Sequence, residues 1–334
     1  VIWGVCESQA VGAAVAPAGD VNGDEVDDMI IGATVSRLGR SPVGAAFVIF
    51  GRRGGFGSEV SVSDIDGRNG FSAYGGEAFN DALGFPVASV GDINGDGLND
   101  IAAGSSYWSD GAQIRTGRGA VIFGRDATGG ELFPAVIEWD DIEGQTGFRF
   151  EGTAGEERAG RSIAAAGDLN SDGIDDLIIG AFRADLPGLQ DVGQAFVVFG
   201  RDDGGFPSTL QLEDIDGQNG FRIDGLEQGD ETGISVSPAG DINGDGMPDV
   251  MVGARFATPD RVESTGAAYV IYGRAPADPC AADLDGDGSL TIFDFLEFQN
   301  LFDARDPIAD FDGDGSLTIF DFLAFQNAFD AGCP

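Results

Sequence analysis

The sequence contains no Lys and no His, and its 18 basic side chains are all Arg. Without His it can form neither a Ser–His–Asp triad nor a His-ligated zinc or haem site. Acidic side chains number 57, so the formal net charge is −39. A charge of this size and sign repels nucleic acids and anionic membrane surfaces, which excludes both as partners.

Long apolar runs and cysteines are also scarce. No run approaches the roughly 18 residues that span a bilayer, so no membrane span is expected. The three cysteines are Cys6, Cys280 and Cys333. The last two enclose the final segment of the chain, a natural place for a disulfide in an oxidising compartment. Cys6 then remains, either as a small buried hydrophobic residue or as a partner for another chain.

What the chain does contain points to a folded protein. Apolar residues make up 42% of it, and it has 55 Gly and 25 Phe. Disordered acidic chains lack the aromatic and β-branched residues needed for a core, so this composition indicates a mostly β protein punctuated by glycine. The excess carboxylates make metal binding the leading hypothesis.

An Asp-x-Asn-x-Asp motif recurs four times, at intervals of 72, 76 and 73 residues, beginning at Asp20, Asp92, Asp168 and Asp241. Each motif is followed by a short apolar strand and then by a second apolar strand that ends in Gly-Arg. In the first three repeats a Gly-rich turn then leads to a further strand that opens with Gly-Phe. Four short strands per repeat predict an all-β propeller with four blades over residues 1–274.

The two ends of this array complement one another. The fourth repeat ends after its third strand, at Arg274, whereas residues 1–4 align with residues 149–152 of a repeat's last strand. We therefore expect the N-terminal strand to complete the last blade. Within one chain this closes a ring, and between chains it makes a dimer or an open fibre. The sequence leaves these alternatives open.

A second duplication follows the short linker at residues 275–279. Within residues 280–334, two acidic loops begin at Asp283 and Asp310, 27 residues apart. Each leads into a segment with Phe and Leu at i+3 and i+4 spacing, residues 293–302 and 320–329. This spacing predicts two amphipathic helices whose apolar faces pack on each other.

The acidic loops have the ligand pattern of Ca²⁺ sites, because this hard cation takes six to eight oxygens from alternate loop positions. In the repeat loops, positions 1, 3, 5 and 9 are oxygen side chains, and position 7 is an apolar residue suited to ligation through its carbonyl. The predicted ligands are Asp20, Asn22, Asp24, Val26 and Asp28; Asp92, Asn94, Asp96, Leu98 and Asp100; Asp168, Asn170, Asp172, Ile174 and Asp176; and Asp241, Asn243, Asp245, Met247 and Asp249.

The two C-terminal loops follow the EF-hand scheme, with Asp in place of Glu at position 12. Their predicted ligands are Asp283, Asp285, Asp287, Ser289 and Asp294; and Asp310, Asp312, Asp314, Ser316 and Asp321. A lone acidic loop could equally be a solvated turn, but six in-phase copies on two scaffolds favour about six Ca²⁺ ions. Glu25 replaces the Gly at position 6 in the first repeat, which predicts a distorted or weaker site there.

The first 275 residues resemble the FG-GAP repeats of integrin α-subunit β-propellers, whose loops read Asp-x-Asn-x-Asp-Gly-x-x-Asp. The resemblance implies a calcium site in each loop that stiffens its blade. Propellers of this family usually have about seven blades. The family's Gly-Ala-Pro signature is altered here, for example in Gly32-Ala33-Thr34.

Residues 280–334 resemble a dockerin of the type that ends in Gly-Cys, here Gly332-Cys333. Dockerins are small α-helical domains with an EF-hand-like pair of calcium loops. This resemblance implies docking through a helix face onto a cohesin-like module, another copy of the chain or a surface protein.

The favoured function is therefore a secreted, extracellular or cell-surface, calcium-stabilised structural or adhesive scaffold. It could assemble into fibres through strand exchange or dockerin docking. The alternative is a module that recognises a protein or a surface glycan and is tethered by its dockerin. Its contact residues would lie in the longer loops that include Tyr107, Trp108 and Arg115, although local packing would explain these residues as well. A glycan-active enzyme is less favoured, because most clustered carboxylates already have a metal role. We predict no catalytic residues.

Overall fold

The computed structural model describes residues 1–4, 9–36, 43–76, 82–109, 114–130, 132–259, 265–273, 282–284, 290–305, 309, 311, 317 and 319–331. The chain divides into two compact units, Val1–Gly273 and Arg274–Pro334. The three cysteines and the linker at residues 275–279 lie outside the described residues. In the part of the chain that is described, no helix is long and apolar enough to cross a membrane.

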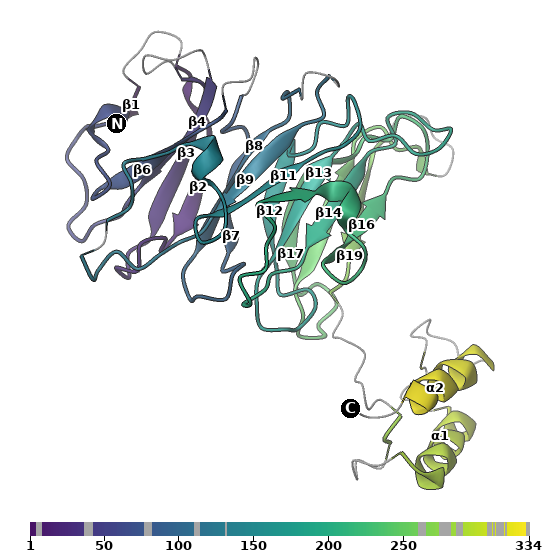
Figure 1. The fold of residues 1–334 in the computed structure, drawn as a ribbon. Helices are drawn as coiled ribbons and strands as arrows, with labels where there is room; N and C mark the ends of the chain where they lie inside the picture. The colour runs from purple at the N-terminus through teal and green to yellow at the C-terminus, as the bar shows by residue number, and fades with distance from the viewer. Residues whose placement is uncertain are drawn as a thin grey trace. The chain divides into compact units, whose positions relative to one another are not determined.

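The first unit consists mainly of four antiparallel sheets that follow one another along the chain (Figure 1). Within each sheet, strands that are consecutive in a repeat pair antiparallel. The strands are β2 (Val11–Gly19), β3 (Asp28–Ser36), β4 (Val43–Ile49) and β6 (Gly70–Tyr74); β7 (Val87–Gly91), β8 (Asp100–Ser105), β9 (Arg118–Ile122) and β11 (Gly147–Glu151); β12 (Ser162–Gly167), β13 (Asp176–Ala181), β14 (Gln194–Val198) and β16 (Gly220–Asp224); and β17 (Thr232–Gly240), β18 (Asp249–Ala254) and β19 (Ala267–Ile271).

Short parallel strands tie the sheets together. After its third strand, the chain of the second and of the third repeat crosses back to the preceding sheet. There β10 (Val136–Ile137) pairs with β6, and β15 (Thr209–Gln211) pairs with β11. A short 3₁₀ turn follows each crossing, η2 (Trp139–Asp141) and η3 (Leu212–Asp214). The first two of the three internal junctions therefore have a parallel strand pair besides their packed side chains.

The cores of the first unit lie between the sheets. Three clusters of buried apolar side chains join the first sheet to the second, the second to the third, and the third to the fourth. A fourth cluster covers the outer face of the first sheet with Val62, Ile65 and Ile2. This face-to-face packing of small four-stranded sheets fits a β-propeller-like arrangement, as predicted.

The N-terminal strand differs from the prediction. β1 (Ile2–Trp3) pairs in parallel with β5 (Val60–Ser61), just before the turn η1 (Val62–Asp64), and not with β19 of the last sheet. The register, Ile2 opposite Val60, repeats that of Phe150 opposite Leu210 at an internal junction. β1 thus lies where the last strand of a preceding sheet would lie. It is paired there with β5, which belongs to the segment that crosses back after the first repeat's third strand. The array is open, so the predicted completion of the last blade by β1 is wrong for this structure.

The second unit contains the two expected helices, α1 (Ile292–Ala304) and α2 (Ile319–Ala331). Thr291 caps α1 in a capping box with Asp294, which satisfies backbone donors at the helix start. Phe298 and Phe325 stack at a centroid distance of 4.4 Å in the centre of an apolar cluster contributed by both helices. The helices therefore pack on each other through their Phe-rich faces.

Candidate metal-binding loops

The four acidic loops occupy equivalent places in the four sheets. Each connects the first strand of its sheet to the second, and each follows a register shift next to a glycine with φ between +70° and +77°. The glycine of the first repeat is also needed for space, since a Cβ on Gly19 would lie 2.3 Å from Asn99 Oδ1. The bulge turns the chain out of the sheet so that the loop side chains gather beyond the strand ends.

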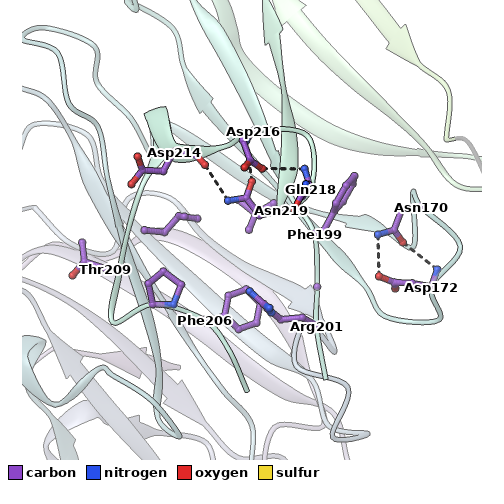
Figure 2. A pocket seen from close by; sticks show the side chains of 14 residues that line it. Asn170, Asp172, Phe199, Arg201, Phe206, Thr209, Asp214, Asp216, Gln218 and Asn219 are labelled. Carbon is purple, nitrogen blue, oxygen red and sulfur yellow. Dashed lines mark hydrogen bonds between the residues drawn. The ribbon is translucent and has the colours of Figure 1, made fainter. Parts of the chain in front are cut away.

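The loop side chains are held by backbone N–H groups in the same manner each time. In the second repeat, Asp92 Oδ1 accepts from the Asp96 N–H at 3.0 Å, and its Oδ2 accepts from the Gly97 N–H at 2.7 Å. Asp96 Oδ1 accepts from the Leu98 N–H at 2.9 Å. The amide of position 3 also donates to the carboxylate of position 5, as Asn170 does to Asp172 at 2.9 Å in the third repeat (Figure 2).

The carboxylate at position 9 is the buried member of each loop. Asp100 accepts from the Ile93 N–H at 2.9 Å and from the Gly124 N–H at 2.7 Å, so it links the loop to the end of the third strand. The pKa of Asp100 rises to about 8, because burial and the nearby Asp96 and Asp92 outweigh the two hydrogen bonds, which lower it. For the same reasons the pKa values of Asp28 and Asp176 rise to about 7. Asp249 has the corresponding two bonds.

The chemistry of this donor set fits Ca²⁺. Each loop offers three carboxylates and one amide oxygen, and it contains no Cys or His. Ca²⁺ takes oxygen ligands of this kind, and its charge would favour the ionised form of the buried carboxylate. Within the described residues, no three Asp, Glu, His or Cys side chains converge in a metal-binding geometry. The loop carboxylates accept hydrogen bonds from backbone N–H groups of their own loops.

Residues at position 8 connect neighbouring loops at two of the three junctions. Asn99 Oδ1 accepts from the Asp20 N–H at 3.0 Å, and the Asn99 N–H donates to the Asp20 carbonyl at 3.0 Å. Asp175 and Asp92 repeat this pair at the next junction. The sequence analysis did not single out position 8. The available signal was a polar residue at this position in three of the four repeats, with Pro248 in the last.

The first loop keeps its shape although it lacks glycine at position 6. Glu25 adopts φ of +63°, close to the +87° to +90° of Gly97, Gly173 and Gly246. A non-glycine residue in this left-handed region costs about 1–2 kcal/mol. The expected irregularity of this loop thus takes the form of local backbone strain at Glu25, in a loop of otherwise regular shape.

The structure describes only part of the two C-terminal loops. The carboxylate of Asp294, at position 12 of the first loop, accepts from the Leu284 N–H at 2.9 Å and from the Thr291 N–H at 2.7 Å. Asp294 and Asp321 are both fully buried at the start of their helices. Positions 3, 5 and 7 of both loops, and Asp310, lie outside the described residues. The predicted EF-hand sites therefore remain predictions.

A recess of about 500 Å³ lies beside the third loop and is lined by Asp172, Arg201 and Phe206, among others (Figure 2). Arg201 is occupied by an ion pair with Asp203 at 2.7 Å. A recess of about 420 Å³ recurs at the first loop, beside the equivalent Asp24 and Arg52. Because equivalent residues line both recesses, the recess is a general feature of the repeat. It does not identify one particular ligand site.

The loop residues considered for ligand contact have different surroundings. Trp108 is buried, and the guanidinium of Arg118 lies between its ring, at 4.4 Å, and that of Trp139, at 3.7 Å. Arg115 forms an ion pair with Glu156 at 3.4 Å. Only Tyr107 presents an exposed ring, with Arg158 over it. Packing therefore accounts for Trp108, whereas Tyr107 remains available to a ligand.

Comparison with known proteins identifies the repeats. The FG-GAP repeat matches residues 86–122, 159–198 and 232–271, which are the second, third and fourth repeats of the array. Each match runs from the first strand through the acidic loop to the third strand. The first sheet has the same strand order and the same loop.

Curated relatives share these repeats over part of their length. A human phosphatidylinositol-glycan-specific phospholipase D is 30% identical over 185 residues, which cover 52% of this chain and 20% of that protein. Integrin alpha pat-2 of Caenorhabditis elegans is 30% identical over 50% of this chain and 13% of its own length. Chicken integrin alpha-V is 30% identical over 59% of this chain and 16% of its own length. The chain thus spans a fifth or less of these relatives, and it carries FG-GAP repeats similar to those of integrin α subunits.

Proposed function

We propose that this protein is a calcium-stabilised extracellular scaffold that presents an FG-GAP array for adhesion or recognition. The array would bind one Ca²⁺ in each repeat loop. The dockerin-like second unit would bind two more and tether the array to a protein partner. Each ion would be held by the side-chain oxygens predicted for its loop together with one backbone carbonyl.

The observation that carries this proposal is the buried Asp at position 9, repeated in all four sheets. Its carboxylate is held by two backbone N–H groups. In the first three sheets, burial and two nearby carboxylates disfavour its ionised form and raise its pKa. A divalent cation is the counter-charge that such a cluster favours. Because position 1 of a loop also bonds to position 8 of the next sheet at two of the three junctions, an ion would stiffen the junction as well as the loop.

The tether is the second part of the proposal. Two Phe-packed helices, each starting at a buried Asp, are consistent with the dockerin-like assignment. The partner would be a cohesin-like module or another copy of the chain. Extracellular placement would suit a calcium-dependent protein, because extracellular modules bind Ca²⁺ with weak affinities that match its high concentration there.

We further propose that the chain is not an enzyme. The phospholipase relative shares only a fifth of its length with this chain, so its activity does not transfer with the repeats. The clustered carboxylates of the array are committed to the loops. A recognition role for a protein or a surface glycan is the alternative, favoured by the exposed ring of Tyr107 under Arg158.

Calcium binding and thermal stability test the proposal together. Isothermal titration of the metal-free chain should show about six ions, of which about four belong to the array. At 100 times the dissociation constant, one bound ion adds about 2.7 kcal/mol to the stability of the fold. Calcium should therefore raise the melting temperature of the array, and EDTA should lower it again.

A matched pair of variants locates the sites. Asp100→Asn should remove one array ion and lower the calcium-dependent gain in stability. Asp140→Asn, a control at an exposed side chain outside the loops, should bind as the parent does. No heat of calcium binding, together with equal melting temperatures in calcium and EDTA, would refute the metal assignment.

A further inference from the structure

The last strand of a repeat is paired along its outer edge by a short crossing strand of the next repeat. β1 pairs with β5, β6 with β10 and β11 with β15, all in parallel. The registers agree, with Ile2 opposite Val60, Ala73 opposite Ile137 and Phe150 opposite Leu210. β16 is the equivalent strand of the third sheet, and among the described residues it pairs with β14 alone. The third sheet therefore lacks a strand that the equivalent position has three times elsewhere.

The outer edge of β16 has the hydrogen-bond donors that a crossing strand uses. In the first sheet the Ser72 N–H donates to the Ala135 carbonyl at 3.0 Å. In the second sheet the Arg149 N–H donates to the Ser208 carbonyl at 3.0 Å, and Arg149 Nε donates to the same oxygen at 3.3 Å. Arg222 has this position in β16, and in the described part of the chain its N–H has no acceptor across the edge. A segment laid along β16 would therefore find a backbone donor and an Arg side chain in the places that Arg149 offers.

At the first two junctions the crossing segment also inserts a Phe ring into the core. Phe133 stacks on Phe71 with ring centroids 4.8 Å apart and 7° between the ring planes. Phe206 stacks on Phe148 at 4.4 Å and 7°. In both segments Pro follows the Phe, and the aliphatic residue that lies opposite the last strand comes four residues after it. Both segments thus share the pattern Phe-Pro-x-x-aliphatic.

The third sheet has the receiving rings of this contact. Phe199 and Phe221 meet at 6.0 Å and 61°, as the equivalent Phe50 and Phe71 do at 6.1 Å and 62°. Phe50 and Phe71 are buried, whereas Phe199, Phe221 and the neighbouring Ile223 are only partly buried. Among the described residues, no third ring contacts Phe199 or Phe221. The place of the inserted ring is therefore prepared on the third sheet.

The sequence of the fourth repeat does not carry the inserting Phe. In each of the first three repeats a Phe follows, within eight residues, the Arg that ends the third strand; the pairs are Arg52 and Phe56, Arg125 and Phe133, and Arg201 and Phe206. The equivalent Arg of the fourth repeat is Arg274, and residues 275–292 contain no aromatic residue. The segment that follows the fourth repeat's third strand therefore does not have the pattern that the other crossing segments share.

From these observations we infer that the outer edge of β16 binds an extended segment of a partner protein with the pattern Phe-Pro-x-x-Leu or Phe-Pro-x-x-Ile. We call the receiving residues Phe199, Phe221, Arg222 and Ile223 the edge site. The bound segment pairs in parallel with β16, its Phe stacks on Phe221, and its aliphatic residue lies opposite Ile223. One of its carbonyl groups accepts from the Arg222 N–H.

This mode of binding is the addition of a strand to a sheet edge. Main-chain hydrogen bonds provide affinity in such complexes, and pockets for particular side chains provide specificity. Here the two selective positions are the Phe and the aliphatic residue, because these contact the core at the internal junctions. The inference goes beyond the proposed function, since it uses neither the calcium loops nor the exposed ring of Tyr107.

A peptide with this chain's own crossing sequence is the direct probe. Residues 204–212, Gly-Gly-Phe-Pro-Ser-Thr-Leu-Gln-Leu, include β15 and the Phe that occupy the equivalent place on the second sheet. A copy with fluorescein at its N-terminus and an amidated C-terminus should bind the full chain and show a saturable rise in fluorescence anisotropy. Peptides with Phe206→Ala or Leu210→Ala should bind at least about tenfold more weakly, because each loses a side chain that binding would bury.

Variants of the full chain locate the bound peptide. Arg222→Pro removes the N–H that would bond to the peptide, at an outer edge where proline is tolerated. Phe221→Ala removes the ring on which the peptide's Phe would stack. Each should weaken binding at least about tenfold. Tyr107→Ala, at an exposed ring outside the edge site, should bind the peptide as the parent does.

Each outcome decides for or against the edge site. No saturable rise in anisotropy with the full chain would overturn the inference, as would equal binding of the Phe206→Ala peptide. Unchanged binding by both chain variants would place the peptide elsewhere, for example on the second sheet in exchange for residues 206–212. Near-ultraviolet circular dichroism checks that the variants fold. If Arg222→Pro does not fold, Phe221→Ala and the peptide series still decide the question.

Discussion

Replacing Glu25 by Gly should stabilise the first repeat. Glu25 holds φ at +63° in the loop where the other repeats have Gly. Removing a non-glycine residue from the left-handed region should raise the free energy of unfolding by about 1–2 kcal/mol. Glycine also increases the entropy of the unfolded chain, which lowers the free energy of unfolding by about 0.4–1 kcal/mol. The ion pair between Glu25 and Arg53 joins two side chains that are 85% and 77% exposed, so its loss costs little. The net expectation is a gain of about 0.5–1 kcal/mol.

The change is measured by urea unfolding of the first unit, followed by near-ultraviolet circular dichroism in calcium and in EDTA. A gain of this size corresponds to an increase of about 1–3 °C in melting temperature for a unit of this length. Gly97→Glu, the reverse change in the second repeat, should destabilise by about 1 kcal/mol or more. Arg53→Ala should have little effect. Lower stability of Glu25→Gly, or equal stability of Gly97→Glu and the parent, would show that the backbone angle is not the deciding factor.

Three further outcomes test other parts of the structure. Burial raises the pKa of Glu157, whose Oε2 accepts from the Thr153 and Ala154 N–H groups. Protonated Glu157 therefore contributes fully to stability below about pH 4.5, its pKa in the unfolded chain, and this contribution is lost as pH rises through the higher pKa of the folded state. In urea unfolding, the stability of Glu157→Gln relative to the parent should therefore increase from pH 4 to pH 8. Gly32→Ala should cost about 3 kcal/mol or more, because its Cβ would lie 1.7 Å from the Gly84 carbonyl oxygen, whereas Gly57→Ala should be nearly neutral. Phe298→Ala should cost the second unit about 3–5 kcal/mol in thermal unfolding.

Much of this fold could be predicted from the sequence, because the repeats can be aligned with one another within the chain. Four copies of one motif at nearly constant spacing locate the loops and the strands on either side of them. The helices of the second unit follow in the same way from duplicated Phe spacing. The Asp at position 9 could also be predicted from the sequence, since it stands at the same place in all four copies of the motif.

The features that were missed depend on what one repeat places against the next. Asn99 looks like an ordinary loop residue until the preceding loop is seen bonding to it. This contact joins residues that are distant in sequence, and no periodicity records it.

The placement of β1 is the clearest example. Alignment of residues 1–4 with a repeat's last strand correctly identifies what kind of strand it is. Whether it joins β19 depends on whether the small rotations between successive sheets add up to a closed ring, and side-chain spacing does not encode that sum. The four described sheets form an open row, and β1 pairs with a crossing segment in the same way as β6 and β11 do at the first two junctions.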